Sequence, residues 1–173
     1  PVGLLLSHRA DWAIVSEVEQ NDDVLFKPLF SYEMVGICSK DHPLANKEVW
    51  QAEDFAEETW VTYLVPDDML DLYRQVLKPK GINPPRRTTE LTIALIQLVA
   101  SRRGIATVPY WAALPYLEKG YVVARKITEE GLYSNLYAAI RKEDANLAYI
   151  EDFHQTVKAQ SFSTLPGLSV LEL

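Results

Sequence analysis

Two short segments of the sequence place polar side chains between a predicted strand and the start of a predicted helix. The first runs from Thr62 to Asp67, and the second runs from Thr88 to Leu91. In open α/β sheets, ligands bind at the carboxyl ends of strands, where the backbone amides of helix N-termini point outward. The threonines of the second segment and such amides suit a carboxylate, while the glutamate of that segment or the aspartate of the first suits an ammonium group. These residues therefore predict a site for a small polar molecule.

The same polar residues also have a purely structural interpretation. Thr88, Thr89 and Glu90 suit the N-cap and the acidic first turn of the helix that follows. Asp67 and Asp68 could act as a general acid and base, but acidic residues are also common in a first helical turn, where they favour the helix dipole. Capping and ligand contact are compatible, so the sequence leaves both roles open.

The chain carries none of the spacings that nucleophilic catalysis, metal binding or phosphate binding requires. It contains no G-x-G-x-x-G, no P-loop and no G-x-S-x-G motif. His8, His42 and His154 lie far apart and give no metal-ligand spacing. Cys38 ends an apolar strand, where a buried structural thiol is expected rather than a nucleophile. We therefore expect no catalytic residue, no metal site and no cofactor.

The composition excludes several classes of partner. With 17 basic and 24 acidic side chains among 173 residues, the chain carries a formal net charge of −7, which repels phosphate backbones. A single cysteine precludes an internal disulfide and indicates a reducing compartment. No apolar run approaches the roughly 20 residues of a membrane-spanning helix. We expect a cytoplasmic protein whose present chain binds neither nucleic acid nor a membrane.

Alternating strands and helices must position the two polar segments. The pattern predicts helices over 66–77, 91–99 and 147–159, and strands over 11–15, 32–38, 60–63, 105–108, 121–124 and 134–140. The first strand is typical of a buried parallel strand, and the residues from 161 onward are expected to be largely unstructured. The opening residues look like a helix that lacks its preceding strand, which predicts a fragment of a longer protein. The fold class is α/β with a mostly parallel sheet.

Two stretches of the sequence resemble the effector domains of LysR-type transcriptional regulators. One runs from Leu29 to Leu44 and ends in the turn Asp-His-Pro-Leu. The other runs from Leu98 to Pro109, where a helix precedes a G-I-A-x-x-P strand. Both stretches occur in order and at a spacing similar to that of the family. The resemblance extends over nearly the whole chain, from Asp11 to about Gln160.

This resemblance implies a two-lobed α/β domain like a type 2 periplasmic binding protein, with mixed, mostly parallel sheets and an N-terminal truncation. Residues 1–33 and 140–165 would form lobe I, which is incomplete, and residues 34–139 would form lobe II. Residues 166–173 would be a C-terminal tail. The family's DNA-binding helix-turn-helix domain is absent from this chain. Promoter DNA would therefore be bound through that missing domain, in a homodimer or homotetramer.

The resemblance also implies a ligand in the cleft between the lobes. Segments 84–92, 108–111 and 130–139 resemble the methionine-biosynthesis regulators of the family, which take homocysteine as co-effector. With homocysteine or a related amino acid as ligand, two tyrosines and a valine would line the thiol arm. The positions that match the family's cleft are Ser16, Tyr63, Val65, Pro66, Asp67, Thr88, Thr89, Glu90, Pro109 and Tyr110.

Two other functions share parts of this pattern. An extracytoplasmic solute-binding protein for an amino acid has the same architecture, and a helix-turn-helix coding sequence upstream of Pro1 would argue against it. A small α/β enzyme needs a nucleophile or an acid–base pair, for which Cys38, Glu90 and Asp67 are the candidates. For the regulator, no turnover of amino-acid substrates is expected.

Overall fold

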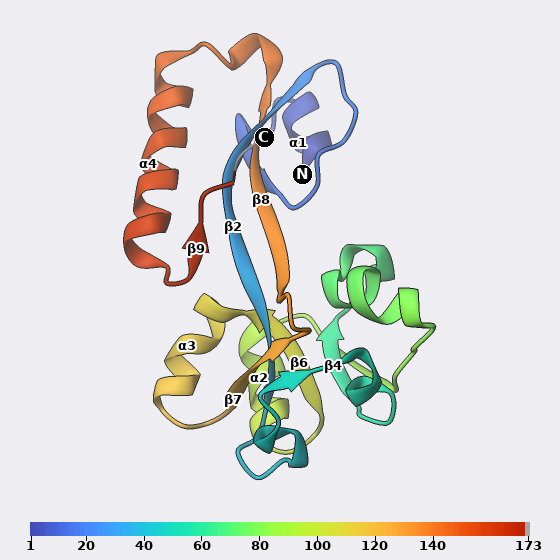
Figure 1. Ribbon diagram of the computed structural model, residues 1–173. Helices are drawn as coiled ribbons and strands as arrows, with labels where there is room; N and C mark the ends of the chain where they lie inside the picture. The colour runs from blue at the N-terminus through green and yellow to red at the C-terminus, as the bar shows by residue number, and fades with distance from the viewer. Residues whose placement is uncertain (172–173) are drawn as a thin grey trace. The chain divides into compact units, whose positions relative to one another are not determined.

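The chain folds into two compact units, of which unit 2 is continuous in sequence. The computed structural model describes residues 1–171 (Figure 1). Unit 1 comprises residues 1–32 together with those from Ser134 onward, and unit 2 comprises residues 33–133. Both boundaries fall inside long strands, β2 (Val24–Cys38) and β8 (Leu132–Arg141), which carry the chain from one unit to the other. This division places residues 134–139 in unit 1 and residue 33 in unit 2, whereas the family resemblance implied lobe II for the former and lobe I for the latter.

Unit 1 is built on antiparallel strand pairs. β1 (Trp12–Val15) pairs with β8, and β9 (Leu168–Ser169) pairs with β2. The prediction of a parallel first strand is therefore wrong, because β1 lies beside β8 and not beside a strand reached through a crossover helix. The prediction of an unstructured tail is also wrong for the described residues, since α4 (Ala148–Thr164) continues past residue 161 and β9 joins the sheet. Residues 172 and 173 of that tail lie outside the described residues.

A buried arginine at the end of β8 holds the short helix α1 (Val2–Leu6) in place. Arg141 donates hydrogen bonds to the carbonyl oxygens of Leu5 at 2.9 Å and Ala10 at 2.5 Å. Its other nitrogens bind the carboxylates of Asp11 at 2.6 Å and Asp144 at 2.5 Å. A helix of five residues is too short to be stable by itself. The conformation of α1 and the loop after it therefore depends on Arg141.

The sheet of unit 2 combines parallel and antiparallel pairs. Its strand order is β2-β6-β4-β5, with β6 at Ile105–Pro109, β4 at Trp60–Tyr63 and β5 at Arg86–Thr89. β4 is parallel to β5 and to β6, whereas β2 is antiparallel to β6 and β7 (Val123–Ile127). β7 also pairs in parallel with β3 (Val49–Trp50). The α/β class with mixed sheets is confirmed. The expectation of a mostly parallel sheet is wrong, because β1 pairs antiparallel with β8 and β2 pairs antiparallel with β6, β7 and β9, and parallel pairing is confined to unit 2 among the described strands.

Two helices of unit 2 pack on its strands. α2 (Thr92–Ala100) contacts β4, β5 and β6, and α3 (Tyr110–Glu118) contacts β6 and β7. The predicted helix over 91–99 is confirmed to within one residue at each end. The sequence pattern missed α3, whose interior contains Pro115. Among the described residues, no helix is long and apolar enough to cross a membrane.

The helix predicted over 66–77 is wrong as a regular α-helix. The segment forms a 3-10 turn at Asp67–Met69, a π-helical stretch at Tyr73–Leu77 and a second 3-10 turn at Lys78–Lys80. The wider i, i+5 spacing of a π-helix brings Leu72 and Leu77 to the same buried face. Core burial therefore overrides regular helix geometry here. Further short 3-10 turns lie at Pro43–Asn46, Ala52–Phe55 and Lys142–Asp144.

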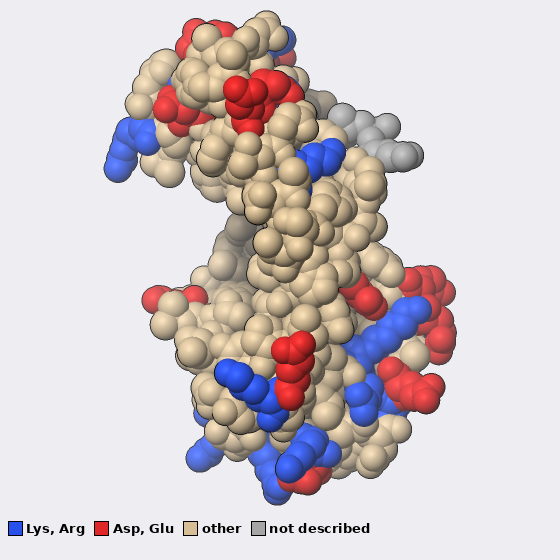
Figure 2. All heavy atoms as spheres, turned by 90° about the vertical axis from the view of Figure 1, so that its left-hand side faces the viewer, with Lys and Arg blue, Asp and Glu red and all other residues tan. Residues whose placement is uncertain are grey.

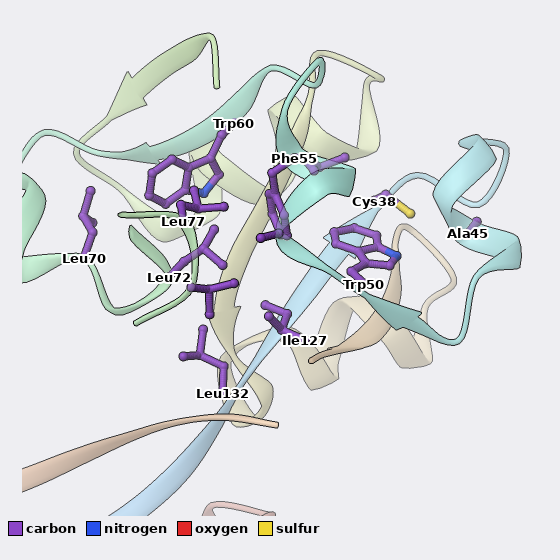
Figure 3. Packing of buried hydrophobic residues seen from close by; sticks show 13 residues of the cluster. Cys38, Ala45, Trp50, Phe55, Trp60, Leu70, Leu72, Leu77, Ile127 and Leu132 are labelled. Atoms are coloured by element: carbon purple, nitrogen blue, oxygen red, sulfur yellow. The ribbon is translucent and has the colours of Figure 1, made fainter. Parts of the chain in front are cut away.

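Two apolar cores lie on opposite faces of the unit 2 sheet, because successive side chains of a strand alternate between faces. Trp60 belongs to one core, and its neighbour Val61 belongs to the other. Figure 3 shows the first core, which includes Trp50, Phe55, Trp60, Leu70, Leu72, Leu77, Ile127 and Leu132. The second core packs α2 and α3 against β2, β4 and β6. Thus β4 is fixed from both sides.

Trp50 packs directly on the backbone of β2 at Gly36. A Cβ atom added at Gly36 would lie 2.4 Å from Cε3 of Trp50. The indole of Trp50 is fully buried, donates from Nε1 to the carbonyl oxygen of Leu44 at 3.0 Å, and meets the ring of Phe55 edge to face at 5.7 Å. Because the indole is held on three sides, only glycine leaves it room.

Candidate ligand-binding site

The carboxyl ends of three neighbouring parallel strands meet at one edge of the unit 2 sheet. β4 ends at Tyr63, which lies opposite Thr89 at the end of β5, and β6 pairs in parallel with the other side of β4. Ser16 follows β1 in unit 1 and is exposed. The other predicted site residues end or follow these strands: Tyr63 ends β4, with Val65, Pro66 and Asp67 after it; Thr88 and Thr89 end β5, with Glu90 after it; and Pro109 ends β6, with Tyr110 after it.

A hydrogen bond joins the end of β4 to the start of α2. The phenolic oxygen of Tyr63 lies 2.8 Å from Oγ1 of Thr92. Tyr63 is half-buried against the second core, so this bond fixes the direction of its ring. Thr92 is not among the residues that the sequence predicted for the ligand site. In the sequence it is marked only by its position at the start of a strongly apolar helix.

The N-terminus of α2 has no side-chain cap. The helix begins at Thr92 with Leu91 as its N-cap, and β5 continues through Thr88 and Thr89. The interpretation of residues 88–90 as the cap is therefore wrong, although Oγ1 of Thr89 accepts a long 3.5 Å hydrogen bond from the amide of Leu91. The first amides of a helix lack intrahelical acceptors and favour an anion. Thr89 thus lies beside amides that suit a carboxylate, whereas the side chain of Thr88 points to the other face of β5.

The two predicted acidic groups differ in what they contact. Asp67 accepts hydrogen bonds from both terminal nitrogens of Arg86, one of them at 3.2 Å. Glu90 is exposed and forms no hydrogen bond or ion pair with the other described residues. Since the carboxylate of Asp67 is already neutralised by a guanidinium group, Glu90 is the acidic side chain available to an ammonium group.

Exposed apolar side chains surround these polar groups. Leu64 and Val65 follow β4, while Leu91 and Ile93 lie at the start of α2. Leu64 and Leu91 are 70% and 62% exposed, which is unusual for leucine in a folded domain. Apolar walls around a few polar groups are typical of small-molecule sites.

Pro109 and Tyr110 are half-buried where β6 passes into α3. Tyr110 lines an open cavity of about 310 Å³ together with Glu33, Val35 and Arg125. None of the other predicted site residues lines this cavity. Tyr110 therefore follows β6 directly in the chain but lines a separate cavity.

The remaining candidate residues have structural surroundings. Cys38 is fully buried, as predicted, and burial raises the pKa of its thiol to about 11. His42 accepts a hydrogen bond from the amide of Leu44 at Nδ1, and its Nε2 lies 3.2 Å from Glu58. Across residues 1–171 there is no group of three or more side chains that could hold a metal ion. These residues stabilise local structure.

Charged side chains of both signs are mixed on the surface. Figure 2 shows Lys and Arg side chains interspersed with Asp and Glu on one face. Several pairs are close, among them Lys47 with Asp54 and Arg74 with Asp71, both at 2.5 Å. With a net charge of −7, this pattern does not suit a phosphate backbone.

The sequence profile described as the LysR substrate binding domain matches residues 1–161, which include parts of both units. The chain belongs to this family. The fold is accordingly that of LysR regulatory domains, a mixed α/β architecture like that of type 2 periplasmic binding proteins.

Named LysR relatives are transcriptional regulators. The chain is 84% identical, over its whole length and 56% of the relative, to the HTH-type transcriptional regulator MetR of Haemophilus influenzae. It is 34% identical to MetR of Escherichia coli K12 over 99% of the chain and 54% of that relative. The chain thus spans about half the length of these relatives. Their names support a regulator and not an enzyme.

Solved structures show the same fold. The regulatory domain of MetR, a LysR family regulator from N. meningitidis, matches 99% of this chain and 80% of its own with a TM-score of 0.93 and 65% identity. The effector-binding domain of QuiR, solved in complex with shikimate, matches 92% of this chain and 77% of its own with a TM-score of 0.75 and 23% identity. The second likeness shows the fold alone.

Proposed function

We propose that this LysR domain is the effector-sensing part of a transcriptional regulator of methionine biosynthesis and binds homocysteine or a closely related amino acid. The observation that carries the proposal is the 84% identity to a MetR protein over the whole chain. The strand edge of unit 2 supports it, because its polar groups suit an amino acid.

The three groups of homocysteine correspond to three features of this edge. Its carboxylate suits the uncapped amides of α2 together with Thr89. Its ammonium group suits Glu90, an exposed carboxylate that forms no hydrogen bond or ion pair with the other described residues. Its short thiol arm suits apolar and aromatic contacts, for which Tyr63 and Val65 are the proposed residues, whereas Tyr110 lines a separate cavity and stays a prediction from the family resemblance. Ser16 stays a prediction from the family resemblance.

In this proposal, DNA is bound by a helix-turn-helix domain outside the present chain, in a cytoplasmic homodimer or homotetramer. Homocysteine can alter DNA binding only if it has different affinities for two arrangements of the protein, because equal affinity shifts no equilibrium. The domain therefore acts through the difference in homocysteine-binding free energy between the two arrangements and not through a chemical step.

Titration of the full-length protein with L-homocysteine, followed by calorimetry, tests the proposal. Wild-type protein should bind homocysteine more tightly than methionine, whose thioether carries an extra methyl group. Thr89→Val should weaken binding about fivefold, the value of one hydrogen bond of about 1 kcal/mol. Glu90→Gln should weaken it about tenfold, because it removes a charge-assisted contact.

The matched control is Thr156→Val, which alters an exposed threonine of α4 in unit 1. Its affinity for homocysteine should equal that of the wild type. Failure of the wild-type protein to bind homocysteine would contradict the ligand. Unchanged affinity in both Thr89→Val and Glu90→Gln would contradict the site.

A further inference from the structure

We infer that Arg86 is a positioning residue, which holds the segment 64–70 after β4 in the conformation that effector binding requires. The inference rests on the proposed function for its link to the effector. Arg86 itself belongs to no predicted set, and it would not touch the ligand. It would act through Asp67, the first residue of the turn that follows β4.

The side chain of Arg86 is fixed by contacts of three kinds. Its guanidinium carbon lies 5.2 Å from the ring centroid of Trp60 and 4.9 Å from that of Tyr73. Its two terminal nitrogens bind the two carboxylate oxygens of Asp67, and one of them also donates to Oδ1 of Asn83 at 3.2 Å. Only 23% of the side chain is exposed. Such a guanidinium group is both paired and stacked, which lysine cannot reproduce.

The strand register explains why this contact crosses from β5 to the segment after β4. Trp60 and Arg86 are direct partners in the parallel β4–β5 pair, so their side chains lie next to each other on one face of the sheet. Tyr73 and Leu70 pack against the core on this same face. Arg86 therefore lies between the rigid strands and the segment that contains Asp67.

The segment from Leu64 to Met69 has few other anchors. Leu64, Val65 and Met69 are exposed, and its hydrogen bonds within the backbone are those of a single 3-10 turn. A segment with little buried apolar surface opens at low free energy unless side chains hold it. The Arg86–Asp67 pair is a side-chain anchor of this segment, which also contains the predicted site residues Val65 and Pro66.

Hydrogen exchange measured by mass spectrometry on the ligand-free, full-length protein tests the anchor directly. Arg86→Met should speed exchange of the amides at 64–70 about fivefold or more, while exchange in α2 and β6 stays unchanged. Arg86→Lys should give an intermediate rate, because it keeps the charge and loses the paired and stacked geometry. Arg87→Met is the matched control, since the neighbouring Arg87 is exposed on the opposite face of β5.

Combining Arg86→Met with Asp67→Asn tests whether the two residues act together. If they form one anchor, the double variant should exchange no faster at 64–70 than Arg86→Met alone. Additive increases in exchange rate, or a uniform increase over the whole of unit 2, would overturn the anchor.

Homocysteine titration of the same variants tests the link to the effector. Arg86→Met should weaken homocysteine binding about fivefold, Arg86→Lys less, and Arg87→Met not at all. Faster exchange with unchanged affinity would overturn the positioning role. If the wild-type protein does not bind homocysteine, the proposed function fails, whereas the exchange result still decides the anchor.

Discussion

Replacing Gly36 by alanine tests whether close packing against Trp50 fixes unit 2. The new Cβ would lie 2.4 Å and 2.6 Å from two ring atoms of Trp50, well inside van der Waals contact. The backbone at Gly36 is not in the left-handed region, so alanine is allowed there on conformational grounds. Any loss of stability therefore measures the clash.

The expected loss is about 2 kcal/mol in the free energy of unfolding. Overpacking of a rigid core costs about 1–3 kcal/mol. If the indole moves instead, Trp50 loses its hydrogen bond to Leu44, which costs about 1 kcal/mol. Against this, alanine gains about 0.5–1 kcal/mol over glycine because the unfolded chain is less flexible.

Urea denaturation with a constant m-value measures the effect. Gly3→Ala is the matched control, because a Cβ there meets no atom within 4 Å, and it should leave stability unchanged or raise it by up to about 1 kcal/mol. Adding Trp50→Phe to Gly36→Ala should cost at least about 1 kcal/mol less than the sum of the single changes. Wild-type stability in Gly36→Ala, or strict additivity in the double variant, would refute the reasoning.

Two further predictions concern buried titratable groups. Burial raises the pKa of the Cys38 thiol to about 11. At pH 8 this thiol should therefore react with iodoacetamide at least about 100-fold more slowly in the native protein than in the urea-unfolded protein. Equal reaction rates would contradict the burial of Cys38. Burial, reinforced by Lys27 and Lys158 and opposed by Glu151, lowers the pKa of His154 below its ordinary value of 6.5. The unfolded state therefore binds more protons just below pH 6.5, so stability falls on acidification. His154→Gln should lose less stability between pH 7.5 and 5.5 in urea titrations, and an equal loss would contradict this account.

Local patterns in the sequence predicted the elements that position the candidate site. The apolar stripe of residues 91–99 predicted α2, and short β-branched runs predicted β4 and β6. The order of strands and helices then placed Tyr63 at a strand end and Thr89 just before α2, although the strand β5 that ends at Thr89 was not among the predicted strands. The structure puts these two residues opposite each other in the register.

Contacts between residues that lie far apart in the sequence could not be predicted from such local patterns. Arg86 and Asp67 are 19 positions apart, and nothing in their spacing predicts that they pair. The π-helical turn at Tyr73–Leu77 arises because core burial outweighs regular hydrogen bonding, and α3 contains a proline that a pattern search treats as a helix breaker. β9 consists of two residues, too few to give a periodic pattern.

The hydrogen bonds of Arg141 link the opening segment to a residue that is synthesised much later. The contact with Leu5 spans 136 positions and that with Asp11 spans 130. A ribosome must therefore produce the whole of unit 2 before α1 acquires the side chain that holds it. Unit 2 ends at residue 133, so its residues are synthesised before Arg141, while the opening apolar segment still lacks this partner. During translation, that segment is therefore exposed to chaperones and to aggregation.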